Sequence, residues 1–213
     1  MFYNDKKVSI AVVRRLPRYY RYLGELLKND VTRISSKELS ERMGVTASQI
    51  RQDLNCFGGF GQQGYGYNVE YLYKEIGNIL GLYNGYTTII IGAGNLGRAL
   101  ANHSSFEKRG FRLIGIFDIN RDLVGEEIRG IKIRHMDELE DFFKENRVDI
   151  GILSIPKEGV AEVSQRLVNL GIKGLWNFSY ADLNLEGDVE IENVHLSDSL
   201  MTLSYKITQH KRW

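Results

Sequence analysis

Apolar positions in the first 84 residues recur at helical spacing, and capping residues divide them into short segments. The pattern predicts four helices, at residues 17–29, 35–43, 46–57 and 68–83. Ser35 with Glu38, and Thr46 with Gln49, have the spacing of capping boxes that open the second and third helices. A glycine-dense segment at residues 58–66 separates the last two helices and favours a tight hairpin.

The pattern changes beyond the turn signal Asn84-Gly85, where strand-like apolar runs alternate with helix-like segments. Strands are predicted at residues 87–92, 111–118, 132–134, 148–155 and 173–178. Helices are predicted from about residue 95 and at 137–146 and 157–170. Strands that alternate with helices in this way indicate a parallel sheet with both faces covered.

The last part of the chain adds an edge strand and a terminal helix. Residues 189–196 have the composition of an edge strand. From Ser197 onward the pattern is amphipathic, and one helical face carries Leu196, Leu200, Leu203 and Ile207. Because a monomer could leave that apolar face exposed, we expect the terminal helix to join two copies of the chain in a homodimer.

These patterns predict an α/β protein in which an N-terminal winged-helix domain precedes a Rossmann-type parallel-sheet domain and a C-terminal helix. The predicted domains are residues 1–84, 85–196 and 197–213. No apolar run approaches the roughly 20 residues of a membrane span, and no secretory signal is evident. We therefore expect a cytoplasmic protein that does not act at a membrane. Its single cysteine, Cys56, excludes an intrachain disulfide.

Charge is unevenly distributed although the formal net charge of the 213 residues is only +1. Residues 1–55 contain 11 Lys and Arg against 6 Asp and Glu, whereas the rest of the chain contains 17 against 21. A basic front on an acidic body suggests that the N-terminal part binds a polyanion such as nucleic acid. Chance variation on a solvated surface is the alternative explanation.

A dinucleotide fingerprint follows the first strand of the second domain. The run Gly92-Ala93-Gly94-Asn95-Leu96-Gly97 has the form GxGxxG and precedes a helix-compatible segment. Asp118 ends the next strand, 21 residues after Gly97. In this motif the glycines allow a tight turn, an approach of the pyrophosphate and close helix–strand packing. An aspartate at the end of the second strand accepts hydrogen bonds from ribose hydroxyls, so NADH or NAD⁺ is favoured, although nearby Arg121 could accommodate the 2′-phosphate of NADP(H).

Later strand ends are further candidates for cofactor binding, because ligands of such sheets lie at the carboxyl ends of the strands. Ser154, Ile155 and Pro156 follow one predicted strand, and Asn177 and Phe178 lie at the end of another. The alternative is ordinary loop and core packing.

The second and third helices have the spacing of a helix-turn-helix, with Gly44 in the turn. On the third helix, Ala47, Ile50, Leu54 and Phe57 share one face and are expected in the core. The other residues are polar and suited to reading the major groove of double-stranded DNA. The candidate DNA-binding residues are Ser48, Gln49, Arg51, Gln52 and Asn55, with Gln62 and Gln63 in the hairpin, which would form the wing.

Four segments together resemble the Rex family of redox-sensing repressors, and the resemblance covers nearly the whole chain. They are VTASQIRQDLNCFGGFGQQGYGYNV, GAGNLGRAL, ILSIP and WNFS. The resemblance implies a cytoplasmic bacterial homodimer that binds palindromic operator DNA and is released by NADH, with NAD⁺ as the weaker or opposing ligand. It also implies that the C-terminal helix is exchanged between subunits.

Two positions depart from the family pattern. Lysine is frequent in the family where this chain has Gln52, and a basic residue is frequent where the wing has Gln62-Gln63. Both departures remove possible contacts to phosphate or guanine. They bear on the strength and sequence preference of DNA binding and leave the fold expectation unchanged.

Other functions remain open on sequence alone. An NAD-dependent oxidoreductase needs a catalytic acid–base group, and only 35 residues follow Phe178, including His195 and His210 without an evident partner. We therefore expect no enzyme activity. A CoA-binding regulatory protein would share the fold, as would a DNA-binding protein whose second domain only dimerises. The four histidines and one cysteine have no metal-ligand spacing, so no metal is expected.

Overall fold

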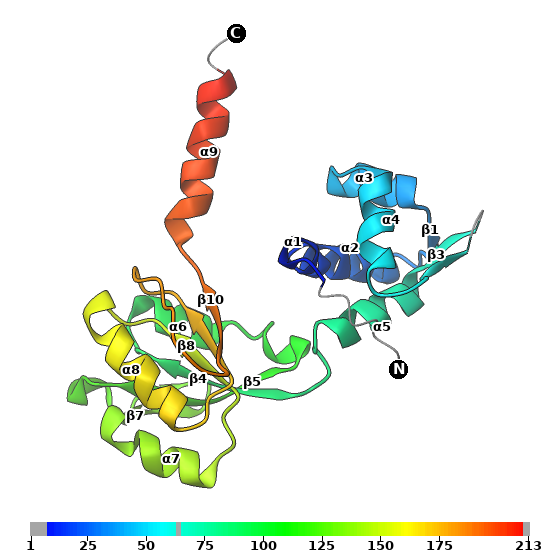
Figure 1. The fold of residues 1–213 in the computed structure, drawn as a ribbon. Helices are drawn as coiled ribbons and strands as arrows, with labels where there is room; N and C mark the ends of the chain where they lie inside the picture. Colours follow the sequence, from blue (N-terminus) through cyan, green and yellow to red (C-terminus); the bar gives the residue numbers. More distant parts are fainter. Residues whose placement is uncertain (1–7, 63–64, 211–213) are drawn as a thin grey trace. The chain divides into compact units, whose positions relative to one another are not determined.

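A computed structural model describes residues 8–62 and 65–210 of the chain. Contacts divide the chain into two compact units that meet between Tyr83 and Asn84 (Figure 1). Each unit buries its own apolar core. The two units are therefore described separately.

The first unit is a winged helix. Its elements are α1 (Ile10–Val13), α2 (Leu16–Lys28), β1 (Arg33–Ile34), α3 (Ser36–Met43), α4 (Ala47–Asn55), β2 (Gly61–Gln62), β3 (Gly66–Asn68) and α5 (Val69–Ile79). The strands form an antiparallel sheet in the order β1-β3-β2, in which Gln62 pairs with Gly66. The four predicted helices correspond to α2, α3, α4 and α5, and the predicted hairpin corresponds to β2 and β3. The short helix α1, which precedes them, was not predicted.

Local capping explains where these helices start and stop. Both halves of the capping box at Ser35 and Glu38 are formed, and Gly44 ends α3 with a φ of 63°, in the left-handed region. Thr46 caps α4 by accepting a hydrogen bond from the backbone N–H of Gln49 at 3.1 Å. The predicted second capping box is not completed, because the side chain of Gln49 donates instead to the carboxylate of Asp53.

The helices of the first unit share one core. Leu16, Tyr19 and Leu23 of α2 are fully buried with Ile50 of α4 and Leu72 of α5. Packing of α4 through Ile50 leaves its opposite face toward solvent. Cys56, at the end of α4, is exposed.

The second unit is built on a seven-stranded sheet. Its strands are β4 (Tyr86–Ile91), β5 (Phe111–Asp118), β6 (Glu127–Ile128), β7 (Ile131–His135), β8 (Ile150–Leu153), β9 (Gly174–Asn177) and β10 (Glu190–Asn193). The strand order is β10-β9-β8-β4-β5-β7-β6, and only β6 is antiparallel to its neighbour. This is the predicted Rossmann-type sheet, with the edge strand at β10.

Helices cover the two faces of this sheet unequally. On one face, α7 (Leu139–Glu145) and α8 (Lys157–Asn169) pack with Ile89, Ile91 and neighbouring strand residues. On the other face, α6 (Asn95–Asn102) packs over Ile90 and Ile152 through residues such as Ala101. The connection from β5 to β7 contains only the 3₁₀ turn η2 (Arg121–Leu123) and β6, so no second helix lies beside α6.

The last described helix is α9 (Leu196–His210), which extends away from the sheet in Figure 1. The predicted apolar face lies on this helix, and its residues are exposed: Leu196 63%, Leu200 66%, Leu203 51% and Ile207 49%. Within the described residues, no helix has the length and apolarity needed to cross a bilayer.

Candidate dinucleotide site and DNA-reading helix

The three glycines of the fingerprint differ in what a side chain would meet. Gly92 has a φ of 99°, and a Cβ there would lie 2.6 Å from the carbonyl oxygen of Ser154. A Cβ on Gly97 would lie 1.9 Å from the carbonyl oxygen of Gly92, so α6 can approach the end of β4 only with glycine there. A Cβ on Gly94 would meet nothing within 4 Å. A side chain would therefore clash with the protein at Gly92 and Gly97, whereas the space beside Gly94 is open.

The helix that follows the loop has the properties of an anion site. Gly94 is the N-cap of α6, and no side chain accepts from the N–H groups of the first turn. These N–H groups and the helix dipole favour a negative group at this end. Asn95 and Leu96 form the first turn, and Ala93 is buried beneath it.

Asp118 holds the fingerprint loop against the end of β5. One carboxylate oxygen, Oδ2, accepts the backbone N–H of Ala93 at 2.6 Å. The other, Oδ1, accepts the backbone N–H of Asn120 at 2.8 Å. A carboxylate has about four acceptor positions, so two stay available for ribose hydroxyls. Arg121 pairs with Asp137 at 3.3 Å on the surface.

The fingerprint loop lies at the point where the strand order reverses. β4 pairs with β5 on one side and with β8 on the other, and the segment after β8 begins at Ser154. The Ser154 hydroxyl donates to the carbonyl oxygen of Gly92 at 2.9 Å. The side chain of Ile155 lies against Gly92, and Pro156 is the N-cap of α8. The structure thus brings Ser154 and Ile155 to the glycine loop.

Asn177 is fully buried and has internal hydrogen-bond partners for its whole amide. Its Nδ2 donates to the carbonyl oxygen of Ala181 at 2.7 Å and to Oδ1 of Asn193 at 2.8 Å. Its Oδ1 accepts from the backbone N–H and the hydroxyl of Ser179 at 3.0 and 2.7 Å. Asn177 therefore organises the loop after β9.

Phe178 lies on the α6 face of the sheet. Its ring contacts Trp176 edge to face, with the ring centroids 4.6 Å apart. Both rings pack against the cluster that contains Ile90 and Ile152. Sequence alone grouped Phe178 with Asn177, but the two side chains have different surroundings.

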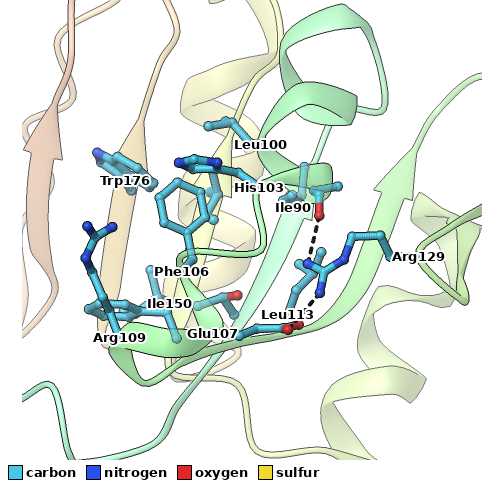
Figure 2. A pocket seen from close by; sticks show the side chains of 14 residues that line it. Ile90, Leu100, His103, Phe106, Glu107, Arg109, Leu113, Arg129, Ile150 and Trp176 are labelled. Atoms are coloured by element: carbon cyan, nitrogen blue, oxygen red, sulfur yellow. Dashed lines mark hydrogen bonds and ion pairs between the residues drawn. The ribbon is translucent and has the colours of Figure 1, made fainter. Parts of the chain in front are cut away.

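A cavity of about 330 Å³ opens on the same face, between the sheet and the segment after α6 (Figure 2). Its walls are mainly aliphatic and aromatic: they include Ile90, Leu100, Phe106, Leu113, Ile152 and Trp176. Arg129 lies at its edge and pairs with Glu107 at 2.7 Å. No fingerprint residue lines this cavity. It was not predicted, because its walls come from segments that lie far apart in the sequence.

The outer face of α4 carries the predicted DNA-reading residues. Ser48, Arg51, Gln52 and Asn55 are exposed, and Gln49 is partly buried. Arg51 donates from Nη1 to the hydroxyl of Ser36 at 2.9 Å, which ties α4 to the start of α3. In the wing, the backbone of Gln62 belongs to β2, and Gln63 lies outside the described residues.

Asp53 of α4 was missed by the sequence analysis, because an aspartate among polar neighbours usually faces solvent. Its side chain is fully buried, and donors from Arg15, Tyr19 and Gln49 surround it. Burial raises the pKa of Asp53, but these donors outweigh burial and hold the pKa below its ordinary value. The ionised carboxylate is therefore the form that the fold selects.

Two family models match the chain. Residues 7–55 match the model described as "Putative DNA-binding protein N-terminus", and residues 84–181 match the model described as "CoA binding domain". The two matches fall in the first and second units respectively.

Curated relatives match almost the full length. The redox-sensing transcriptional repressor Rex of Thermoanaerobacter pseudethanolicus is 64% identical over 205 residues, covering 96% of this chain and 92% of that protein. The protein of the same name from Clostridium perfringens is 58% identical over 207 residues, covering 97% and 98%.

Solved structures agree in fold. The crystal structure of RSP in complex with beta-NAD⁺ and operator DNA has a TM-score of 0.91 and 62% identity, covering 97% of this chain and 95% of that chain. The structure of RSP in complex with beta-NADH has a TM-score of 0.90 and 59% identity, covering 97% of each chain. RSP is described as a Rex-family repressor.

Proposed function

This chain belongs to the Rex family of redox-sensing transcriptional repressors, and we propose that it binds NADH or NAD⁺ in its second unit and operator DNA through its first. NADH then releases the protein from DNA. The observation that carries the proposal is the presence in one chain of an exposed polar face on α4 and an open glycine loop beside Asp118. RSP, which this chain resembles over its whole length, has been solved with both kinds of ligand.

The proposed cofactor site combines the glycine loop with the strand ends on either side of it. Its residues are Gly92, Ala93, Gly94, Asn95, Leu96, Gly97, Asp118, Ser154, Ile155, Pro156 and Phe178. Asn177 is the remaining residue of the proposed site; its amide bonds within the protein, so its proposed role is to hold the strand end beside the cofactor. Apolar side chains such as Ile155 and Pro156 disfavour the positively charged nicotinamide of NAD⁺ and favour the neutral ring of NADH.

The proposed DNA-binding residues lie on α4 and in the wing. They are Ser48, Gln49, Arg51, Gln52 and Asn55, with Gln62 and Gln63. A palindromic operator requires two such surfaces, spaced by about 34 Å or a multiple of it. We propose that the exposed apolar face of α9 joins two chains into the homodimer that provides them. NADH acts by stabilising a form of the dimer in which the distance between the two DNA-reading surfaces does not match the two half-sites of the operator.

We propose that the protein is a regulator and catalyses no reaction. We also propose that it is cytoplasmic, because bacterial operators lie in the cytoplasm. His195 has a carboxylate partner that the sequence did not reveal: its Nε2 lies 2.7 Å from Oδ1 of Asp182. That pair holds the loop after β9 to the start of α9, which is a structural use of the imidazole.

Titration of the dimer with NADH, NAD⁺ and coenzyme A tests the proposal. NADH fluorescence should rise on binding, and a palindromic operator should compete with NADH. NAD⁺ should leave the operator complex largely intact, and coenzyme A should displace neither ligand. Equal effects of NADH and NAD⁺ on operator binding would contradict redox sensing. Binding of coenzyme A that is tighter than binding of NADH would favour the alternative of a CoA-binding regulatory protein. The second matching family model, described as "CoA binding domain", is consistent with that alternative.

A further inference from the structure

The buried carboxylate of Asp53 has a complete set of donors. Its Oδ2 accepts from Nε of Arg15 at 2.6 Å and from the hydroxyl of Tyr19 at 2.8 Å. Its Oδ1 accepts from Nη2 of Arg15 at 2.7 Å and from Nε2 of Gln49 at 2.8 Å. Each carboxylate oxygen therefore has two donors, and the group joins α4 to the start of α2.

This arrangement fixes which way the amide of Gln49 is turned. An ionised carboxylate accepts hydrogen bonds and cannot donate them, so the amide nitrogen of Gln49 must face Asp53. The fold keeps Asp53 ionised, because the pKa of this carboxyl lies below its ordinary value. The amide oxygen of Gln49 then does not bond the carboxylate, and the residue is partly exposed, so this oxygen remains available to a ligand of α4.

Gln49 occupies a position from which a base can be read. It lies in the first turn of α4, three residues after the N-cap Thr46. In helix-turn-helix proteins the N-terminal residues of the second helix contact the base edges. Ser48 and Gln52, one position before Gln49 and three after it, are exposed.

We propose that Asp53 is a positioning residue for base selection and acts through Gln49. By holding the amide nitrogen, it makes Gln49 present an oxygen acceptor to the major groove. Such an acceptor selects a base with an exocyclic amino group, adenine through N6 or cytosine through N4, over guanine O6 or thymine O4. This inference rests on the proposed function, in which α4 reads operator DNA.

A purely structural role for Asp53 predicts different behaviour. A buried ion pair that only anchors α4 would, when broken, weaken binding to every DNA sequence in the same proportion. A positioning role changes the ranking of sequences. The deciding measurement is therefore relative affinity across a set of operators, at one salt concentration, with the folded fraction of each variant checked by thermal unfolding.

The main experiment compares Asp53→Asn with Tyr19→Phe in the full-length dimer. Asparagine can donate, so Gln49 can turn its oxygen inward and present N–H groups to the DNA. Tyr19→Phe removes one donor to the same carboxylate but leaves the contact from Gln49 intact, which makes it the matched control. The DNA set consists of operator variants in which each half-site position is replaced, one position at a time, by each of the four base pairs.

The native protein should prefer an amino-bearing base at one half-site position. Asp53→Asn should reduce that preference by roughly tenfold, the size of one good base contact. Tyr19→Phe should retain the native ranking, and affinity for unrelated DNA should stay unchanged in both variants. In a Gln49→Ala background, Asp53→Asn should have no further effect on the ranking.

A second variant keeps the proposal testable if Asp53→Asn folds poorly. Gln49→Met keeps the length of the side chain but has no amide oxygen, so it should lose the preference for an amino-bearing base. Native ranking in Gln49→Met, or in a folded Asp53→Asn, would overturn the inference. Absence of any sequence preference in the native protein would instead overturn the proposed function.

Discussion

Oδ2 of Asp118 accepts the backbone N–H of Ala93 at 2.6 Å, which links the end of β5 to the loop after β4. This hydrogen bond shapes the glycine loop before any ligand arrives. Asp118 thus has two tasks, because the same carboxylate has acceptor positions left for ribose hydroxyls. Substitutions at Asp118 are therefore expected to affect both the loop and the ligand.

Asp118→Ala should weaken NADH binding by about 1.5–3 kcal/mol, the range for a hydrogen bond to a charged group. Fluorescence titration with NADH measures this loss. Operator affinity without a cofactor should stay at the native value, since the first unit does not contain Asp118. Unchanged NADH affinity in Asp118→Ala would exclude this carboxylate from the site.

The three glycines should separate ligand binding from stability. Gly94→Val should fold normally, because its Cβ points into open space, and should lose NADH binding by blocking the pyrophosphate. The result would be a repressor that NADH does not release. Gly97→Ala should unfold at a lower temperature, because its Cβ would lie 1.9 Å from the carbonyl oxygen of Gly92. Thermal unfolding and NADH titration of both variants check this contrast, and native NADH affinity in Gly94→Val would refute it.

Local signals were sufficient to predict where most helices and strands of this fold lie, because each of these signals depends on residues close in sequence. The Ser35 capping box and the strand ending at Asp118 are of this kind. The contacts around Asp53 could not be predicted, because Arg15 lies 38 residues earlier in the chain. The partners of the Asn177 amide could not be predicted either, because Asn193 lies 16 residues later in the chain.

The apolar face of α9 should hold the dimer together. Truncation before Ser197 should give monomers or insoluble protein. Leu203→Glu should give the same result in a milder form, because it introduces a charge on the face formed by Leu196, Leu200 and Ile207. Thr202→Glu, on the opposite face of the helix, is the matched control and should stay dimeric. Sedimentation analysis distinguishes the species, and a soluble dimeric truncation with full operator affinity would count against the prediction.

Gln52, exposed on α4, should read adenine through N6 and N7 and should accept an A·T pair where a lysine would favour guanine. Gln52→Lys should shift the preference toward G·C by about 1–3 kcal/mol. It should also steepen the dependence of affinity on salt, because it adds one positive charge near the phosphates. Operator affinities for both versions at fixed salt test this. If native and variant proteins rank them identically, Gln52 is only a solvated residue.

The pair of His195 and Asp182 should make the start of α9 sensitive to pH. The hydrogen bond that Nε2 of His195 donates to Asp182 raises the pKa of His195 above its ordinary value, and the charges of Asp182 and Asp198 add to this effect. Since the pKa is raised in the folded state, the stabilisation is complete at acidic pH and is lost as pH rises through the folded pKa. Asp182→Asn should lower the pKa of His195, as measured by NMR titration of the imidazole. An unchanged titration curve in that variant would show that the pair does not form in solution.

The internal hydrogen bonds of Asn177 have a mechanical consequence. Asn177 is the last residue of β9, at the edge of the sheet where the cofactor is expected, and its amide holds Asn193, the last residue of β10. The chain enters α9 only three residues later, at Leu196, and α9 continues for 15 residues. At about 1.5 Å per residue, the helix is roughly 22 Å long. A tilt of about 15° at the start of this helix would move its far end by roughly 6 Å, because that end lies roughly 22 Å away.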